Sequence, residues 1–180
     1  DCKVILLVRD PRDILVSSYF QKTTRNFDTL GQKNPFTGGL SDYVYEEIGG
    51  FDTILRFYHI WEKNRQIPED FLLVRYEDIH QNTYKELRKI IEFTGFHEVR
   101  NEILMEAVEF ASFANMHKME TTNPTKRNYR LKPGNIDNRE SYKTRRGKIG
   151  GFYDYLTEDE IEYLNRKMRN SLSNFFGYNS

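Results

Sequence analysis

The sequence of 180 residues lacks several features that mark common classes of protein. Cys2 is the only cysteine, so the chain cannot form an internal disulfide, which favours a reducing compartment. No apolar run is long enough to span a membrane, so we expect a soluble protein. A cytoplasmic location fits both features, and a lumenal location stays open.

The sequence also lacks an excess of charge of one sign, and it lacks the residue spacings typical of metal sites. The chain carries 27 basic and 27 acidic residues, and its net charge of zero does not favour a general binder of nucleic acid. No spacing of histidine, cysteine or acidic residues matches a metal site, and there is no Walker loop with its lysine. We therefore expect neither a metal nor nucleic acid as a partner.

What the sequence does contain is the strand and helix alternation of an α/β protein, and we expect residues 1–180 to form a single domain. Two apolar runs without polar alternation, at 3–8 and 71–74, predict parallel strands covered on both faces. Apolar residues at helical spacing predict helices over 51–63, 84–93 and 98–110, and a last helix that a capping box of Thr157 and Glu160 begins and Gly177 closes. In the polar stretches 27–50 and 112–151, apolar residues do not recur at the spacing of a helix or a strand, apart from a short helical candidate over 41–48.

The predicted sheet has few strands for an α/β domain. Two parallel strands are too few for a stable sheet, and the first of them starts at the third residue of the chain. We therefore expect further strands before Asp1, which would make the 180 residues an N-terminally incomplete domain.

The first strand leads into the segment RDPRD, which turns into a helix that carries Ser17. Asp10 suits the N-cap position of this helix, and Asp13 suits the acid of a capping box. Arg9 and Ser17 then lie where a buried strand ends and the positive end of a helix dipole begins, which predicts an anion site. In the alternative interpretation, Arg9 pairs with Asp10 or Asp13 at the surface and Ser17 is an ordinary helical residue.

A second basic feature lies between Lys126 and Lys148. Nine basic residues stand there against two acidic ones, Asp137 and Glu140, which gives a local excess of seven positive charges. Such a concentration in a neutral chain favours an anionic ligand. The glycines of RRGKIGGF, at 145–152, let backbone amides approach a phosphate closely. A solvated basic loop is the alternative interpretation.

Four motifs, in their order along the chain, resemble those of sulfotransferases that use 3′-phosphoadenosine 5′-phosphosulfate (PAPS). They are RDPRDILVS at 9–17, YED at 76–78, SFANM at 112–116 and RRGKIGGF at 145–152. The resemblance covers nearly the whole chain and implies a P-loop-like parallel sheet flanked by helices, helix-rich in this portion. It also implies PAPS as the donor, adenosine 3′,5′-bisphosphate (PAP) as the product, and no metal.

The resemblance assigns roles to residues at matching positions. It implies that Arg9 and Ser17 bind the 3′-phosphate of the donor and that Tyr76 contacts the adenosine. The resemblance places Ser112, Phe113 and Met116 around the adenine. It implies that Arg145, Arg146 and Gly147 also bind the 3′-phosphate.

Three positions depart from the family pattern. Arg146 replaces a lysine, which keeps the charge and permits a bidentate contact. Ala111 replaces a threonine and Phe152 replaces a tryptophan, and each of these changes removes a hydrogen-bonding group. The dimerisation pattern of the family survives only at Thr157 and Glu162, so we do not predict the family's dimer and leave the oligomeric state open.

The catalytic residues of the family have no match in this sequence. The loop that binds the 5′-phosphosulfate, with its lysine, and the catalytic histidine precede the family's strand that corresponds to the first strand here. The resemblance therefore implies that both lie upstream of residue 1. The four histidines of this chain, His59, His80, His97 and His117, match no catalytic position.

The function implied by the resemblance is transfer of a sulfuryl group from PAPS to a hydroxyl or amine of a small-molecule acceptor, with this chain supplying the 3′-phosphate and adenine site. The stretch 27–50, with Tyr43, Tyr45 and Phe51, is a candidate for shaping the acceptor pocket. Two alternatives stay open. One is a non-catalytic nucleotide-binding fragment or degenerate relative, and the other is a binder of sulfated glycans or nucleic acid through residues 126–148.

Overall fold

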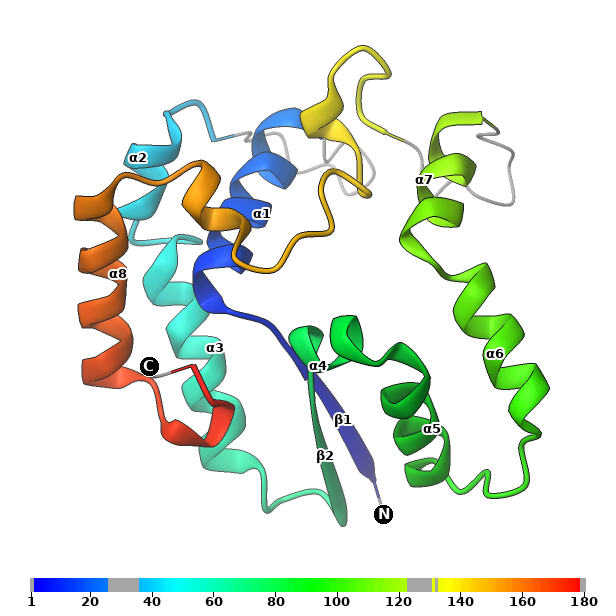
Figure 1. Ribbon diagram of the computed structural model, residues 1–180. Coiled ribbons are helices and arrows are strands. Elements are labelled where there is room, and N and C mark those ends of the chain that lie inside the picture. Colours follow the sequence, from blue (N-terminus) through cyan, green and yellow to red (C-terminus); the bar gives the residue numbers. More distant parts are fainter. Residues whose placement is uncertain (1, 26–35, 123–130, 132, 179–180) are drawn as a thin grey trace.

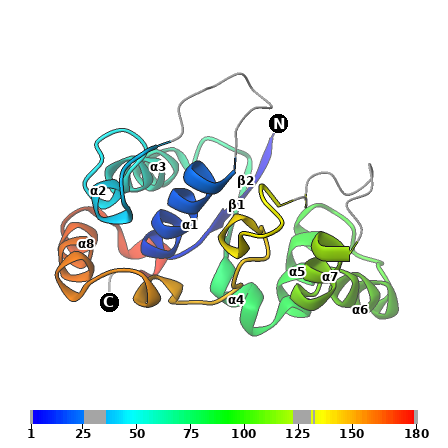
Figure 2. The same cartoon turned by 90° about the horizontal axis from the view of Figure 1, so that it is seen from above.

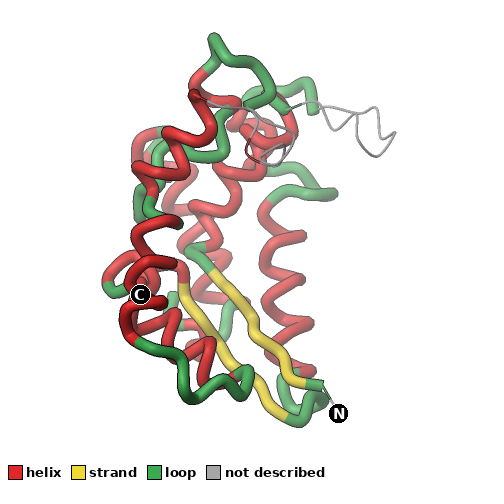
Figure 3. The backbone as a smooth tube through the Cα atoms, turned by 90° about the vertical axis from the view of Figure 1, so that its right-hand side faces the viewer, coloured by secondary structure: helices red, strands yellow, loops and turns green. Residues whose placement is uncertain are grey.

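The computed structural model describes residues 2–25, 36–122, 131 and 133–178 (Figure 1). Two parallel strands, β1 (Lys3–Val8) and β2 (Asp70–Arg75), lie side by side among helices (Figure 3). Their register pairs the first residues of the two strands and also the last, Val8 with Arg75, so both strands end at the same edge. The α/β class and both predicted strands are confirmed.

Helices account for most of the remaining described residues. The crossover from β1 to β2 contains α1 (Pro11–Thr24), α2 (Leu40–Val44) and α3 (Phe51–Asn64), and β2 is followed by α4 (Tyr76–Gln81), α5 (Thr83–Phe93), α6 (Asn101–Phe110) and α7 (Phe113–Thr122). The last part of the chain contains the 3₁₀ helices η3 (Arg139–Ser141) and η4 (Gly151–Asp154), then α8 (Glu158–Ser171) and the 3₁₀ helix η5 (Asn174–Phe176). Figures 1 and 2 show α2, α3 and α8 on one side of the strands and α5, α6 and α7 on the other. In the described part of the chain, no helix combines the length and the apolar character needed to cross a bilayer.

The hydrophobic core lies where α1, α2, α3 and α8 meet, and Leu15, Leu164 and Phe176 are fully buried in it. Tyr43 and Phe51 also belong to this core, at 0% and 1% exposure, because they fill the space between α2, α3 and α1. Within the described residues both side chains pack in the core, and their suggested role in shaping the acceptor pocket stays a prediction. Residues 27–35 of the same stretch lie outside the described residues. Tyr45 is exposed and packs against the Tyr163 ring of α8, with 4.9 Å between the ring centroids.

One face of β1 differs from the prediction. Leu6 and Val8 are buried, but Ile5 and Leu7 are 39% and 56% exposed. Successive side chains of a strand point to opposite faces, so the described residues bury Leu6 and Val8 on one face of β1 and leave the other face in contact with solvent. The expected burial on both faces is therefore not found among the described residues.

Side-chain caps fix where two helices begin. The Asp10 carboxylate accepts the N–H of Arg12 at 2.9 Å at the start of α1. The predicted capping box of Thr157 and Glu160 is present at the start of α8. Gly177, with a φ of +73°, ends η5 rather than α8, so the predicted closure of the last helix by this glycine is wrong.

The stretch 112–151 contains α7, although its apolar residues do not recur at helical spacing. Ser112 begins this helix, because its hydroxyl accepts the N–H of Asn115 at 3.3 Å. The side chain that α7 buries is Glu120 rather than an apolar residue, which explains why the helical pattern of apolar residues is weak. The helical candidate at 41–48 is also shorter in the structure, where it forms α2.

Candidate functional site

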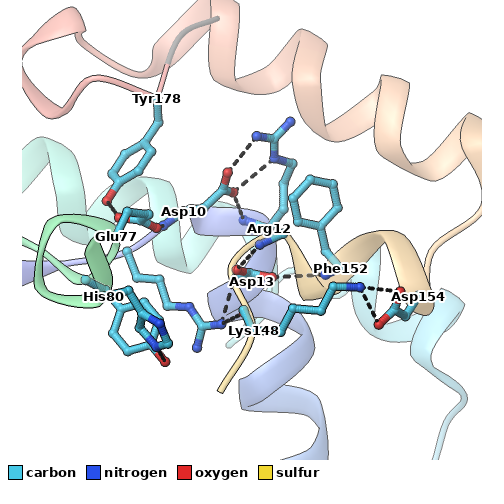
Figure 4. Close-up of polar contacts among 12 residues, drawn as sticks. Asp10, Arg12, Asp13, Glu77, His80, Lys148, Phe152, Asp154 and Tyr178 are labelled. Carbon is cyan, nitrogen blue, oxygen red and sulfur yellow. Dashed lines mark hydrogen bonds and ion pairs between the residues drawn. The ribbon is translucent and has the colours of Figure 1, made fainter. Parts of the chain in front are cut away.

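The corner that follows β1 is held by hydrogen bonds from neighbouring elements. The N–H of Arg9 donates to the Tyr58 hydroxyl of α3 at 3.1 Å, and this hydroxyl donates to the Arg9 carbonyl. The N–H of Asp10 donates to the Glu77 carboxylate of α4 at 2.9 Å, and the hydroxyl of Tyr178 donates to the other oxygen of this carboxylate at 2.5 Å (Figure 4). Burial raises the pKa of Tyr58, which keeps its hydroxyl protonated. The backbone of the corner is therefore fixed on both sides.

The Arg9 side chain lies between Tyr76 and Asp13. Its guanidinium carbon is 4.3 Å from the centroid of the Tyr76 ring, which is a cation–π arrangement. The guanidinium donates to Asp13 Oδ2 at 3.1 Å and to the Lys148 carbonyl at 2.9 Å. Asp13 is only 3% exposed and the Arg9 side chain 24%, so this is a partly buried contact and not the surface pair of the alternative interpretation.

Asp13 also joins α1 to the loop that follows the basic motif. Its two oxygens accept the N–H groups of Gly150 and Phe152, each at 3.0 Å (Figure 4). Burial raises the pKa of Asp13, and the charge of Arg9 and the two backbone N–H groups oppose that rise. The acceptor role of Asp13 toward this distant loop replaces its predicted role in a capping box.

Arg145 is enclosed by aromatic rings. Its guanidinium carbon lies 4.3 Å from the ring centroid of Phe20 and 4.9 Å from that of Tyr155. It donates to the Glu140 carboxylate at 2.9 Å and also to the Tyr155 hydroxyl. These contacts fix the guanidinium in one orientation at the wall of the site.

Arg146 is more open to solvent. It pairs with Asp154 at 3.2 Å, and the Lys148 ammonium reaches the same carboxylate at 2.8 Å. The hydrogen bond from Lys148 lowers the pKa of Asp154. Both cations are about half-exposed, so an anion can approach them from solvent.

Gly147 brings the basic motif against α7. Its φ of +58° lies in the left-handed region, and a Cβ there would lie 2.5 Å from the Phe113 ring. A glycine is therefore required for this close approach. The His117 ring stacks nearly parallel to Phe113, with 6.2 Å between the ring centroids.

These side chains surround one cavity of about 300 Å³. The predicted site residues that line it are Arg9, Ser17, Tyr76, Phe113, Met116, Arg145, Arg146 and Gly147. Ser17 is exposed there, and its hydroxyl makes no hydrogen bond to any residue that the structure describes. Ser112 is the predicted residue that does not line the cavity, because its side chain caps α7.

Other residues, to which the sequence assigned no role toward a ligand, also line the cavity, among them Asp13, Lys143, Thr144, Lys148 and Tyr155. Lys143 and Lys148 belong to the basic segment 126–148, whose excess of positive charge already indicated an anionic ligand. Asp13 lies within the first motif and Tyr155 three residues after the last one, but nothing in their own pattern points to a cavity. The basic residues at 126, 127, 130 and 132 lie outside the described residues.

Residues 1–176 match the family model of the sulfotransferase domain, and the chain belongs to that family. The resemblance stated from the four motifs is therefore confirmed at the level of the family. Mouse sulfotransferase 1B1 is 28% identical over 179 residues, which cover 96% of this chain and 54% of the relative. Cytosolic sulfotransferase 12 of Arabidopsis thaliana is 29% identical over 171 residues, which cover 92% of this chain and 48% of the relative. The chain spans about half the length of these curated relatives.

A solved structure shares the fold. Mouse sulfotransferase SULT7A1, crystallised in complex with PAP, matches with a TM-score of 0.72 at 20% identity. The match covers 98% of this chain and 61% of that one.

Proposed function

We propose that this chain holds the 3′-phosphate and adenine of PAPS in a sulfotransferase that acts on a hydroxyl or amine of a small-molecule acceptor. The observation that carries the proposal is the convergence of two distant basic segments on one cavity, Arg9 at the end of β1 and Arg145–Gly147 after η3. Mouse SULT7A1, which shares the fold, was crystallised with PAP, and this supports the same class of nucleotide here.

The lining of the cavity fits both parts of a 3′-phosphoadenosine group. Arg9, Arg146 and the exposed hydroxyl of Ser17 provide positive charge and donors for a phosphate. Tyr76 and Phe113 provide aromatic surface against which an adenine can stack. The charged and the aromatic residues lie on the same cavity, as a single nucleotide requires.

The residues of this chain bind and orient, and PAPS supplies the sulfuryl group when it is bound. The 3′-phosphate is remote from the reacting sulfur, so binding energy obtained at Arg9 and Arg146 can be used to align the donor. Each charged hydrogen bond to the phosphate contributes about 1.5–3 kcal/mol. We propose that the catalytic base and the lysine for the 5′-phosphosulfate belong to the part of the relatives that this chain does not span, so that residues 1–180 are one incomplete domain. The cytosolic sulfotransferases among the relatives support a cytoplasmic setting.

The test is thermal unfolding of the chain with three kinds of anion. PAP at a hundred times its dissociation constant should raise the free energy of unfolding by about 2.7 kcal/mol. Arg146→Ala, with binding about tenfold weaker, should reduce this gain to about 1.4 kcal/mol at the same PAP concentration, whereas Arg166→Ala, on α8 and outside the cavity, should keep it in full. Stabilisation by heparin or single-stranded DNA without stabilisation by PAP would contradict the proposal and support a polyanion binder. Turnover of PAPS by the complete protein with phenol, alcohol and amine acceptors distinguishes a transferase from a nucleotide-binding relative without activity.

A further inference from the structure

Glu120 is a charged side chain that α7 buries, at 2% exposure. Its Oε1 accepts the N–H of Lys143 at 2.6 Å, and its Oε2 accepts the N–H and the hydroxyl of Thr144 at 2.8 and 2.6 Å. All three donors belong to the two residues that immediately precede Arg145. A buried carboxylate is costly unless hydrogen bonds replace its water, so Glu120 favours the loop position in which these bonds form.

The other end of the same loop is held in the same way. Asp13 of α1 accepts the N–H groups of Gly150 and Phe152. The segment 143–152 therefore lies between two buried carboxylates, each of which accepts two backbone N–H groups. Segments without regular secondary structure usually open easily, and these bonds oppose such opening on both sides of the basic motif.

The helix that carries Glu120 also forms the aromatic wall of the cavity, through Phe113. His117, one turn after Phe113, has its Nδ1 at 2.8 Å from the Thr144 hydroxyl oxygen. Because this hydroxyl donates to Glu120, its oxygen accepts from His117. One helix thus provides the surface for an adenine and fixes the segment that presents Arg145 and Arg146.

We propose that Glu120 is a positioning residue that fixes the basic motif at the cavity, so that the adenine wall and the phosphate-binding arginines keep one geometry. Glu120 does not line the cavity and would act on the nucleotide only through Arg145 and Arg146. The identity of the nucleotide rests on the proposed function, but the positioning of the segment does not.

The test uses Glu120→Gln, because the NH₂ group of glutamine cannot accept the backbone N–H groups. Glu86→Gln is the matched control, since Glu86 is a buried glutamate of α5, at 7% exposure, that faces Lys89. We expect Glu120→Gln to accelerate amide hydrogen exchange at 143–147 by about tenfold or more and to leave the exchange of α8 unchanged. We expect the same variant to bind PAP about tenfold more weakly, with neither effect in the control. Unchanged exchange at 143–147, or unchanged PAP binding by a wild-type chain that binds PAP, would overturn the proposal.

A double-mutant cycle with Arg146→Ala distinguishes positioning from a merely structural role. If Glu120 acts through the basic motif, Arg146→Ala should weaken PAP binding about tenfold in the wild type and less than about threefold in the Glu120→Gln background. Fully additive losses would mean that Glu120 does not act through Arg146.

A second pair of variants applies if Glu120→Gln does not fold. Thr144→Val removes one of the three bonds and should weaken PAP binding about threefold, whereas Thr144→Ser should restore it. Equal losses in both variants would overturn the proposal. Absence of PAP binding by the wild-type chain would refute the proposed function instead, and the exchange measurement would still decide whether Glu120 positions the segment.

Discussion

The Arg9 guanidinium and the Asp13 carboxylate form a hydrogen-bonded ion pair at 3.1 Å, in which the Asp13 side chain is only 2% exposed. The pair joins the end of β1 to the first turn of α1. Because Asp13 also accepts the N–H groups of Gly150 and Phe152, it joins both to the loop after the basic motif. Two segments that lie far apart in the sequence are thereby fixed around one cavity.

Asp13→Asn should lower the free energy of unfolding by about 3 kcal/mol. The change leaves Arg9 without its charge partner and places an NH₂ group against a backbone N–H. Asp52→Asn is the control, because Asp52 forms an exposed pair with Lys167 and its loss should cost less than about 1 kcal/mol. Urea unfolding measures both values, and equal losses would mean that the Asp13 contacts do not stabilise the fold.

Gly147→Ala should weaken PAP binding about tenfold, because the new Cβ would displace the Phe113 ring from the cavity wall. Gly95→Ala is the matched control. Gly95 also has a positive φ, of +96°, but a Cβ there meets nothing within 4 Å. Both variants should lose about 1–2 kcal/mol of stability from backbone strain. Titration with PAP separates them, and a control that loses as much affinity as Gly147→Ala would contradict the assigned role of the Phe113 contact.

Asp154→Asn should strengthen PAP binding by about two- to fivefold. Asp154 pairs with Arg146 and Lys148, so a phosphate at these cations must compete with its carboxylate. The gain should shrink as salt is added, because the groups are exposed. Asp159→Asn, an exposed change in the first turn of α8, should leave the affinity unchanged. Weaker binding by Asp154→Asn would show that the carboxylate orients Arg146 for the ligand instead of competing with it.

The capping box of α8 should make stability depend on pH. Burial alone would raise the pKa of Glu160, but hydrogen bonds from Ser41 and Thr157 outweigh burial and hold this pKa below its ordinary value. A carboxyl whose pKa is lower in the folded state stabilises the fold above its unfolded pKa, and this contribution is lost as the pH falls through the folded pKa. We expect the free energy of unfolding to decrease from about pH 5 to pH 3, with a shallower decrease in Glu160→Gln. Glu162→Gln, at an exposed pair with Arg169, should keep the wild-type slope in the same urea series, and an unchanged slope in Glu160→Gln would refute this prediction.

The sequence predicts the parts of the site that are attached directly to regular elements. Arg9 follows a strand and Ser17 lies on the helix after it, so their meeting needs only local geometry. The roles of Asp13 and Glu120 could not be predicted, because their partners are backbone N–H groups up to 139 residues away. A helix that buries a carboxylate bonded to backbone N–H groups does not show apolar residues at helical spacing. This is why the sequence did not predict α7, whereas the apolar residues of α8 predicted that helix. The exposed face of β1 was not predicted either, because an apolar run indicates what can be buried and not what covers it.

Recognition of a 3′-phosphate by this cavity is tested most directly by calorimetric titration of the chain with PAP and with adenosine 5′-monophosphate, which differ only in that phosphate. We predict that PAP binds at least about tenfold more tightly, and that the difference falls below about threefold in Arg146→Ala. Equal affinities of the wild-type chain for the two nucleotides, or no detectable binding of PAP, would contradict the assignment of the cavity.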